Sequence, residues 1–206
     1  MNIILLGAPF SGKGTLARKI SKDFGIVQVS CGDLFRENVK NGTEIGLLAE
    51  KFINHGELVP DDVTVKMVQE RVSKSDCKKG FILDGFPRTL QQGVGLEKFV
   101  RVDVVVMLDV SFDEVKRRCL GRMMCSGCGE IYNTSSYSEN ICTKCSSPLI
   151  HRDDDNLNVV ENRLEVYEKL TKPLINFYAD RLFVVNGDES PDTIYETVKN
   201  FLKGVK

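Results

Sequence analysis

The feature that most constrains this chain is a glycine-rich loop near its start, Gly7-Ala8-Pro9-Phe10-Ser11-Gly12-Lys13-Gly14-Thr15. The loop follows an apolar run at residues 3–6 and precedes a segment with helical spacing. This order of strand, GxxxxGK loop and helix is typical of phosphate binding, because backbone N–H groups at a helix start and the Lys13 ammonium can surround phosphate oxygens. The loop therefore predicts an α/β fold with a phosphate site where the first strand ends.

Four further short apolar runs are typical of strands: Val27–Ser30, Phe81–Asp84, Val104–Asp109 and Leu182–Asn186. The segments between them have apolar residues at three- and four-residue spacing, which is the pattern of helices. Strands that alternate with helices predict a parallel sheet flanked by helices, in three layers. Apolar spacing over residues 156–180 predicts a long helix, with Pro173 at a kink or near a break.

Composition limits the kind of partner. The chain has 206 residues, enough for one α/β domain with a small insertion. Its 28 basic and 29 acidic residues give a formal net charge of −1, so it has no surplus positive field to hold nucleic acid or an anionic membrane. The first apolar run is too short for a signal segment or a bilayer span. We therefore expect a cytoplasmic protein with a small-molecule partner.

The alternation of strands and helices stops at residues 121–155, where Gly, Ser, Asn and Cys dominate, so this segment looks inserted. It holds two CxxC pairs, Cys125 with Cys128 and Cys142 with Cys145, separated by thirteen residues. Two such pairs supply four thiolates in a tetrahedron, the set that suits structural Zn²⁺. A disulfide or a free-thiol cluster is the alternative, which a reducing compartment disfavours. Four sulfur ligands leave no open position, so we expect the zinc to stabilise the insertion without acting on substrate.

A second motif, Asp84-Gly85-Phe86-Pro87-Arg88, lies at the C-terminal end of a predicted strand, where open α/β sheets bind their ligands. Asp84 could orient Mg²⁺ through its water shell, and the Arg88 guanidinium could bind a phosphate with two hydrogen bonds. Asp-Gly alone is an ordinary turn signal. Beside a phosphate-binding loop, the motif predicts the second half of a site.

In order and spacing, these motifs resemble the adenylate kinase family along the whole chain. The resemblance rests on residues 7–15, on 30–36, on 84–89 with Gln92, on 121–122, and on 152–155 with Arg163 eleven residues after Arg152. The loop ends in GKGT, with Gly14 where Ser or Thr is usual, which suggests a nucleoside-monophosphate kinase. The resemblance implies the P-loop fold of such kinases, with a core at 1–29, 60–120 and 156–206, an AMP-binding segment at 30–59 and a zinc-binding lid at 121–155.

The resemblance also implies which residues act. It implies a catalytic set of charged side chains at the transferred phosphoryl group: Lys13, Asp84, Arg36, Arg88, Arg122, Arg152 and Arg163. It implies ATP contacts from Phe10, Ser11, Gly12, Lys13, Gly14, Thr15, Arg118, Arg122, Ile131, Tyr132 and Glu189. It implies AMP contacts from Cys31, Arg36, Glu57, Leu58, Val59, Gly85, Phe86, Pro87, Arg88, Gln92, Arg152 and Arg163. This crowd of cations suits phosphoryl transfer, which needs positioning and charge stabilisation more than covalent catalysis.

The implied reaction is the reversible transfer ATP + AMP ⇌ 2 ADP, by a monomeric, Mg²⁺-dependent enzyme whose lid closes over the phosphates. Two residues depart from the family pattern. Phe10 stands where the family usually has glycine, and a positive φ there would cost about 1–3 kcal/mol. Cys31 stands where threonine is usual, which replaces a hydroxyl near the AMP base with a weak S–H donor.

Two other functions stay open. The acceptor could be UMP, CMP or GMP, although Gln92 favours AMP because its amide can both donate and accept at an adenine edge. Paired CxxC knuckles also occur in zinc ribbons that bind nucleic acid, so the chain could be an ATPase with such a module. Residues 121–155 carry three basic and five acidic side chains and no basic patch interleaved with aromatics, which argues against nucleic acid.

Overall fold

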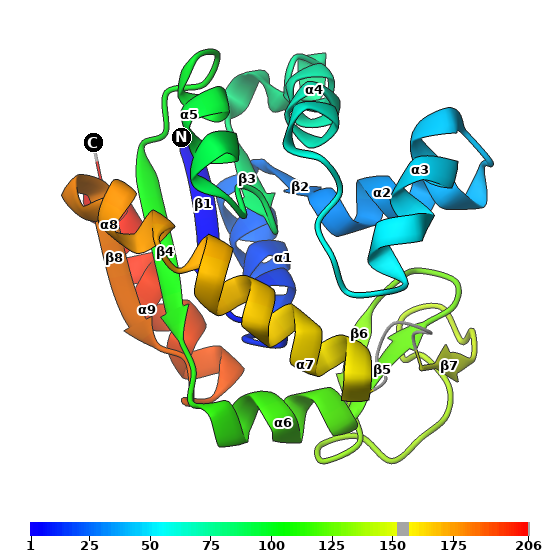
Figure 1. The fold of residues 1–206 in the computed structure, drawn as a ribbon. Helices are drawn as coiled ribbons and strands as arrows, with labels where there is room; N and C mark the ends of the chain where they lie inside the picture. The colour runs from blue at the N-terminus through cyan, green and yellow to red at the C-terminus, as the bar shows by residue number, and fades with distance from the viewer. Residues whose placement is uncertain (152–156, 206) are drawn as a thin grey trace.

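The computed structural model describes residues 1–151 and 157–205. Its central sheet has five parallel strands: β1 (Asn2–Gly7), β2 (Val27–Ser30), β3 (Phe81–Asp84), β4 (Val104–Asp109) and β8 (Leu182–Asn186). Their order across the sheet is β2-β3-β1-β4-β8 (Figure 1). All five predicted strands are confirmed. The register pairs Leu5 with Asp84, so the glycine-rich loop and the Asp84 motif leave the same edge of the sheet.

Helices cover both faces of this sheet because side chains alternate along each strand. Ile3 and Leu5 of β1 belong to one buried cluster with side chains of α1 (Lys13–Phe24) and α9 (Pro191–Gly204). Ile4 and Leu6 belong to a second cluster, whose helical members come from α4 (Asp61–Val72), α5 (Leu90–Glu97) and α8 (Leu174–Phe177), among others. The predicted three-layer arrangement is confirmed (Figure 1).

Two helices, α2 (Cys31–Lys40) and α3 (Glu44–Ile53), project beyond the end of β2 (Figure 1). Each begins at a hydroxyl cap, Ser30 or Thr43, whose oxygen accepts a backbone N–H of the first turn. They pack closely at Gly46, where an added Cβ would lie 2.2 Å from a carbonyl oxygen of α2. Both helices fall within the predicted AMP-binding segment, residues 30–59.

A second sheet follows α6 (Phe112–Leu120) and is separate from the first. It has three antiparallel strands in the order β6-β5-β7: β5 (Arg122–Cys125), β6 (Ile131–Asn133) and β7 (Leu149–Ile150). Figure 1 shows this small sheet on the same side of the core as α2 and α3. The prediction of an insertion outside the parallel sheet is therefore confirmed.

The segment predicted as a long helix is helical but interrupted. Its described part forms α7 (Leu157–Val166), a π-helical turn (Tyr167–Thr171), α8 and a 3₁₀ turn (Ala179–Arg181); another 3₁₀ turn (Ser75–Lys79) precedes β3. Pro173 comes directly before α8. Proline lacks an N–H and its ring clashes with a preceding carbonyl, so the helix breaks near Pro173, as predicted. Among the described residues, every helix is too short or too polar to cross a bilayer.

Candidate active site

A cavity of about 800 Å³ opens at the carboxyl ends of β1, β3 and β4. Open α/β sheets bind their ligands at this edge. Residues of the glycine-rich loop, the Asp84 motif and the small sheet all line it. Every residue predicted to contact ATP lies in this lining: Phe10, Ser11, Gly12, Lys13, Gly14, Thr15, Arg118, Arg122, Ile131, Tyr132 and Glu189.

The backbone of the glycine-rich loop takes left-handed conformations at three positions that matter here. Gly7 has a φ of 143°, and an added Cβ there would lie 2.7 Å from the Leu108 carbonyl oxygen. Gly12 has a φ of 93° and comes directly before α1. Phe10 has a φ of 63°, so the position where the family has glycine does require a positive φ. The loop keeps a phenylalanine there at a cost of about 1–3 kcal/mol.

Lys13 lies against its own loop. Its ammonium donates to the carbonyl oxygens of Gly7 at 2.8 Å and Ala8 at 2.7 Å, and to Ser11 Oγ at 3.1 Å. The Ser11 side chain is fully buried. These contacts hold a positive charge at the start of α1, beside the backbone N–H groups that a phosphate would use.

Burial and neighbouring charges shift the pKa values of Lys13 and the ionisable groups around it. Burial lowers the pKa of Lys13 to about 8; Asp84 opposes this shift, and Arg88 and Arg122 add to it. Burial raises the pKa of Asp84 against the Lys13 charge and against a hydrogen bond that Gln28 Nε2 donates to Asp84 Oδ2 at 3.1 Å. Burial also lowers the pKa of Arg88. A buried group of cations with one carboxylate favours a polyanionic ligand.

A smaller cavity of about 70 Å³ adjoins the first beside α2. Arg36, Gly85, Arg88 and Arg163 line both cavities, so cationic side chains stand where the two meet. Nine of the residues predicted to contact AMP line the smaller cavity: Cys31, Arg36, Glu57, Leu58, Val59, Gly85, Arg88, Gln92 and Arg163. Burial raises the pKa of the Cys31 thiol to about 11, so this side chain is uncharged at neutral pH.

Three residues predicted for the AMP site are placed differently. Phe86 is 1% exposed and packs in the second core cluster, so its ring faces the core. Pro87, which follows a cis peptide bond, lines the larger cavity. Arg152 lies outside the described residues.

Gln92 uses its amide within the protein. Its Nε2 donates to Asp61 Oδ1 at 2.7 Å, and its Oε1 accepts the Arg88 N–H at 2.7 Å. Asp61 Oδ2 also accepts the Thr89 hydroxyl at 2.9 Å. An amide has two N–H donors and two acceptor lone pairs, and these two bonds use one of each.

Arg118 is also used within the protein. Its Nη1 donates to the Ser11 carbonyl at 2.9 Å, its Nη2 to the Gly187 carbonyl at 2.7 Å, and its Nε to Glu114 Oε1 at 2.7 Å. The side chain therefore ties the glycine-rich loop to the turn after β8, which carries Glu189. Ser11, and Asp188 and Glu189 of that turn, line the larger cavity.

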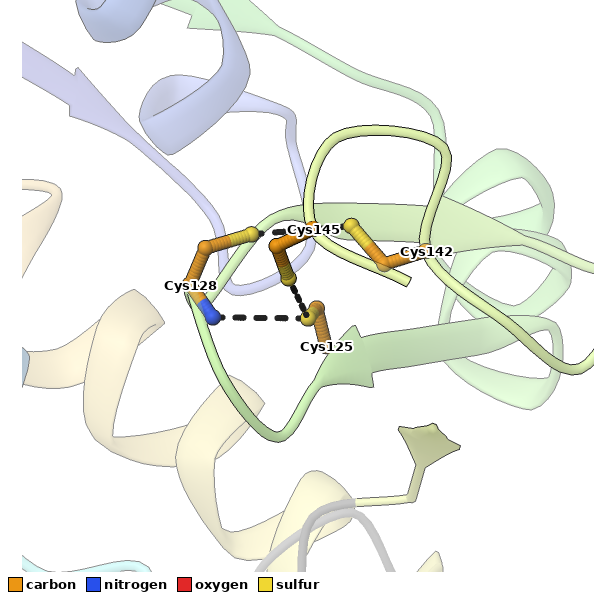
Figure 2. Close-up of side chains that lie close together, drawn as sticks. All are labelled: Cys125, Cys128, Cys142 and Cys145. Atoms are coloured by element: carbon orange, nitrogen blue, oxygen red, sulfur yellow. Dashed lines mark hydrogen bonds between the residues drawn. The ribbon is translucent and has the colours of Figure 1, made fainter. Parts of the chain in front are cut away.

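The four cysteines of the insertion meet in one cluster (Figure 2). Cys125 Sγ lies 3.3 Å from Cys145 Sγ, Cys128 Sγ lies 3.6 Å from Cys142 Sγ, and all four sulfurs lie within 4.8 Å of one another. All four are free thiols, and these separations far exceed a disulfide bond of about 2.05 Å. A tetrahedral Zn²⁺ with bonds of about 2.3 Å places its sulfurs about 3.8 Å apart. The cluster has the donor set and nearly the spacing of such a site.

Comparison with known proteins decides the family. The family model described as adenylate kinase matches residues 5–182. Relatives named adenylate kinase include those of Caldanaerobacter subterraneus subsp. tengcongensis, 44% identical over 99% of this chain and 97% of the relative, and Clostridium novyi, 41% identical over 100% of both. A third, from Acetivibrio thermocellus, is 44% identical over 100% of both. The chain belongs to the adenylate kinase family.

Membership in the adenylate kinase family confirms the resemblance inferred from the motifs, and it makes the chain a nucleoside-monophosphate kinase, a phosphotransferase. The parallel sheet flanked by helices is consistent with the P-loop fold of such kinases. The cluster of four cysteines fits the zinc-binding lid type.

Two polar residues at the site of this adenylate kinase family member were missed by the motif analysis. Gln28 holds Asp84, and its signal was available, because it is a polar residue inside the short strand β2. Asp61 holds Gln92 and Thr89. An acidic residue in the first turn of a helix is common, so Asp61 gave no signal in the sequence.

Proposed function

We propose that the protein catalyses ATP + AMP ⇌ 2 ADP, with Mg²⁺ bound to the ATP phosphates. The observation that carries this proposal is the pair of adjoining cavities with Arg36, Arg88 and Arg163 at their junction. The larger cavity lies over the phosphate loop, on the side proposed for the donor, and the smaller cavity extends it beside α2, on the side proposed for the acceptor. Phosphates from both would then meet among these cations, which is what in-line phosphoryl transfer requires.

Each cation has a proposed place in this arrangement. Lys13 and the loop N–H groups hold the ATP phosphates, as helix N-termini with a lysine do in P-loops. Arg36 and Arg88 hold the AMP phosphate. Arg122 and Arg163, together with Arg152 from outside the described residues, neutralise charge on the transferred group. Their combined charge stabilises the transition state without any covalent intermediate.

Mg²⁺ fits the chemistry of Asp84. The Asp84 carboxylate is an oxygen donor that lines the larger cavity next to the loop, and one of its oxygens lies 3.3 Å from where a Gly14 Cβ would be. Carboxylates that bind Mg²⁺ directly or through water are the usual arrangement in phosphoryl transfer. Bound there, Mg²⁺ supplies charge neutralisation to the phosphate oxygens. Gln28 keeps the carboxylate oriented through its hydrogen bond.

We further propose that the chain divides into a core (1–29, 60–120 and 156–206), an AMP-binding segment (30–59) and a lid (121–155). Lid and core already touch: Arg18 of α1 donates to Glu130 Oε2 at 3.2 Å and to the Gly129 carbonyl at 3.0 Å. Closure of the lid would keep water from the γ-phosphate. Zn²⁺ held by the four cysteines would cross-link the lid, as a structural site with a full set of sulfur ligands.

A coupled assay with ATP and each of AMP, UMP, CMP and GMP tests the reaction and the acceptor. We expect phosphoryl transfer to AMP, dependence on Mg²⁺, and loss of turnover on chelation by EDTA. Preference for UMP, CMP or GMP would favour the alternative acceptor. The neutral thiol of Cys31 is a weaker hydrogen-bond partner than a hydroxyl, so it discriminates less between nucleotide bases. Formation of two ADP for each ATP and each AMP consumed would confirm the stoichiometry of the proposed reaction. A monomer without affinity for nucleic acid or membranes, located in the cytoplasm, is part of the same prediction.

A further inference from the structure

Phe10 and Arg122 come from distant parts of the chain and meet at the larger cavity. Phe10 belongs to the loop between β1 and α1, and Arg122 is the first residue of β5, where the chain enters the small sheet. The guanidinium carbon of Arg122 lies 4.3 Å from the centroid of the Phe10 ring. This distance is within the range of a cation–π interaction. Both residues line the cavity, so the contact lies beside the phosphate loop.

Arg122 stands among like charges. It is close enough to Lys13 for its charge to contribute to the lowered pKa of that lysine. Repulsion between these cations disfavours an arginine at this place. The face of an aromatic ring carries partial negative charge and attracts a guanidinium. Unlike a carboxylate, the ring does not repel the phosphates that the cations are there to bind.

The conformation of Phe10 supports a role for its side chain. Its φ of 63° lies in the region that glycine adopts freely and that phenylalanine adopts only with strain. Strained residues of this kind cluster at functional sites, where the surrounding structure holds them in place. The ring also packs against the second core cluster, which fixes its orientation.

We propose that Phe10 is a positioning residue that holds the Arg122 guanidinium against the phosphate-binding loop. The ring attaches the first residue of β5 to the phosphate-binding loop, through the arginine that we propose acts on the transferred group. This inference rests on the proposed function in one respect, which is the action of Arg122 on phosphate. Loss of the ring should therefore impair turnover and leave the AMP site intact.

Steady-state kinetics of ring-keeping and ring-removing variants test this. Phe10→Leu should lower kcat by about tenfold or more, since small displacements of a positioning group cost up to about 10²-fold. The KM for AMP should stay close to the wild-type value. Phe10→Tyr keeps the ring and should restore most of the turnover. A kcat for Phe10→Leu equal to wild type, or an equal loss in Phe10→Tyr, would overturn the proposal.

A matched control comes from another cation–π pair. Lys116 Nζ lies 4.5 Å from the ring centroid of Phe112, which is 55% exposed at the start of α6. Phe112→Leu makes the same change of side chain away from the phosphate loop. We expect its kinetic constants to match wild type. A loss of turnover equal to that of Phe10→Leu would show a general effect of ring removal and refute the specific role.

Fluorescence tests the contact between the Arg122 guanidinium and the ring at position 10, without any substrate. The chain contains no tryptophan, so Phe10→Trp introduces a single indole. Adding Arg122→Ala should increase quenching of that indole by acrylamide and shift its emission, because the guanidinium no longer covers the ring. Adding Arg117→Ala instead removes a neighbouring α6 arginine, which is bonded to Glu114. This change should leave the quenching and the emission of the indole unchanged. Unchanged quenching with Arg122→Ala would refute this contact, whereas wild-type protein that transfers no phosphoryl group to AMP would refute the proposed function alone.

Discussion

The core and the lid are held together by different means. In the core, two clusters of buried apolar side chains lie on the two faces of a parallel sheet, and strands such as β1 are almost wholly buried. In the lid, the buried cluster consists of Cys125, Cys142 and Leu149, so two of its three members are thiols. Burial of apolar surface stabilises the core, whereas a small unit with so little apolar surface needs a cross-link.

The proposed active site lies where the core and the proposed lid meet, and side chains from both line the larger cavity. Lys13, Asp84 and Arg88 stand on the rigid core, and Arg122 stands at the root of the lid. A charged group on a rigid element can be removed without unfolding its support, whereas a change in the lid's cross-link should loosen the lid alone. The four predictions below test this difference, starting with the largest effect.

The first prediction separates chemistry from folding in the core. Arg88→Ala should lower kcat by about 10³-fold or more, as removal of an arginine that stabilises phosphoryl transfer does in related chemistry. Its melting temperature should change little, because burial already lowers the pKa of Arg88 and its charge is costly to bury. Enzyme kinetics and thermal melting measure the two effects. Arg101→Ala, at a side chain that is 92% exposed, is the control and should change neither.

The second prediction concerns the cross-link. Purified, reduced protein should contain one Zn²⁺ per chain, and Cys142→Ser should lose most of it. Metal binding contributes directly to folding free energy, so the lid should melt first and the core at a higher temperature. Elemental analysis and melting curves provide the measurements.

Cys77→Ser is the matched control for the zinc prediction. Cys77 is a buried core thiol, which accepts a hydrogen bond from Arg71 Nη1 at 3.2 Å. This variant should keep its zinc and lose only some core stability. Wild-type protein without stoichiometric metal would contradict the role of the cluster, and a single cooperative melt in Cys142→Ser would contradict the contrast between lid and core.

The third prediction uses pH to test the charge at the phosphate loop. Burial lowers the pKa of Lys13 to about 8, so its ammonium is charged at neutral pH and loses its proton as the pH rises through that value. The KM for ATP should therefore rise above pH 8, by up to about tenfold per pH unit. Lys13→Arg keeps its charge throughout this range and should give a flatter profile. The same rise in both proteins would assign the effect to another group.

Much of the core could be predicted from sequence because local patterns determine it. The three central strands, β1, β3 and β4, are buried along most of their length and appear as continuous apolar runs, and the edge strands β2 and β8, although only partly buried, are short apolar runs as well. The glycine-rich loop and the cysteine spacing are equally local. The division of residues 156–180 into separate helical pieces followed only in part from Pro173, because the sequence pattern does not indicate the π-helical turn at Tyr167–Thr171.

Long-range contacts at the site could not be predicted from sequence. Nothing near Asp61 indicates that it holds Gln92, and nothing near Phe10 indicates that its ring meets Arg122. Arg118, predicted to contact ATP, lines the larger cavity, and its bonds to carbonyls of two other segments could not be predicted. Such contacts join residues far apart in the chain, and only the folded arrangement brings them together.

The last and smallest effect concerns the contact that joins lid to core. Glu130 accepts from Arg18 of α1 at 3.2 Å and lies 2.7 Å from Lys144 Nζ of the lid, so one carboxylate bridges the two regions. These groups are partly exposed, and such ion pairs contribute about 0.2–1 kcal/mol. Glu130→Gln should therefore speed tryptic cleavage after Lys144 by only about two- to fivefold, and the difference should shrink as salt screens the charges. Glu139→Gln makes the same change at an exposed lid residue and should leave the rate unchanged. Equal rates for Glu130→Gln and wild type at low salt would mean that this carboxylate adds nothing to the attachment, which then rests on other contacts such as the bond from Arg18 to the Gly129 carbonyl.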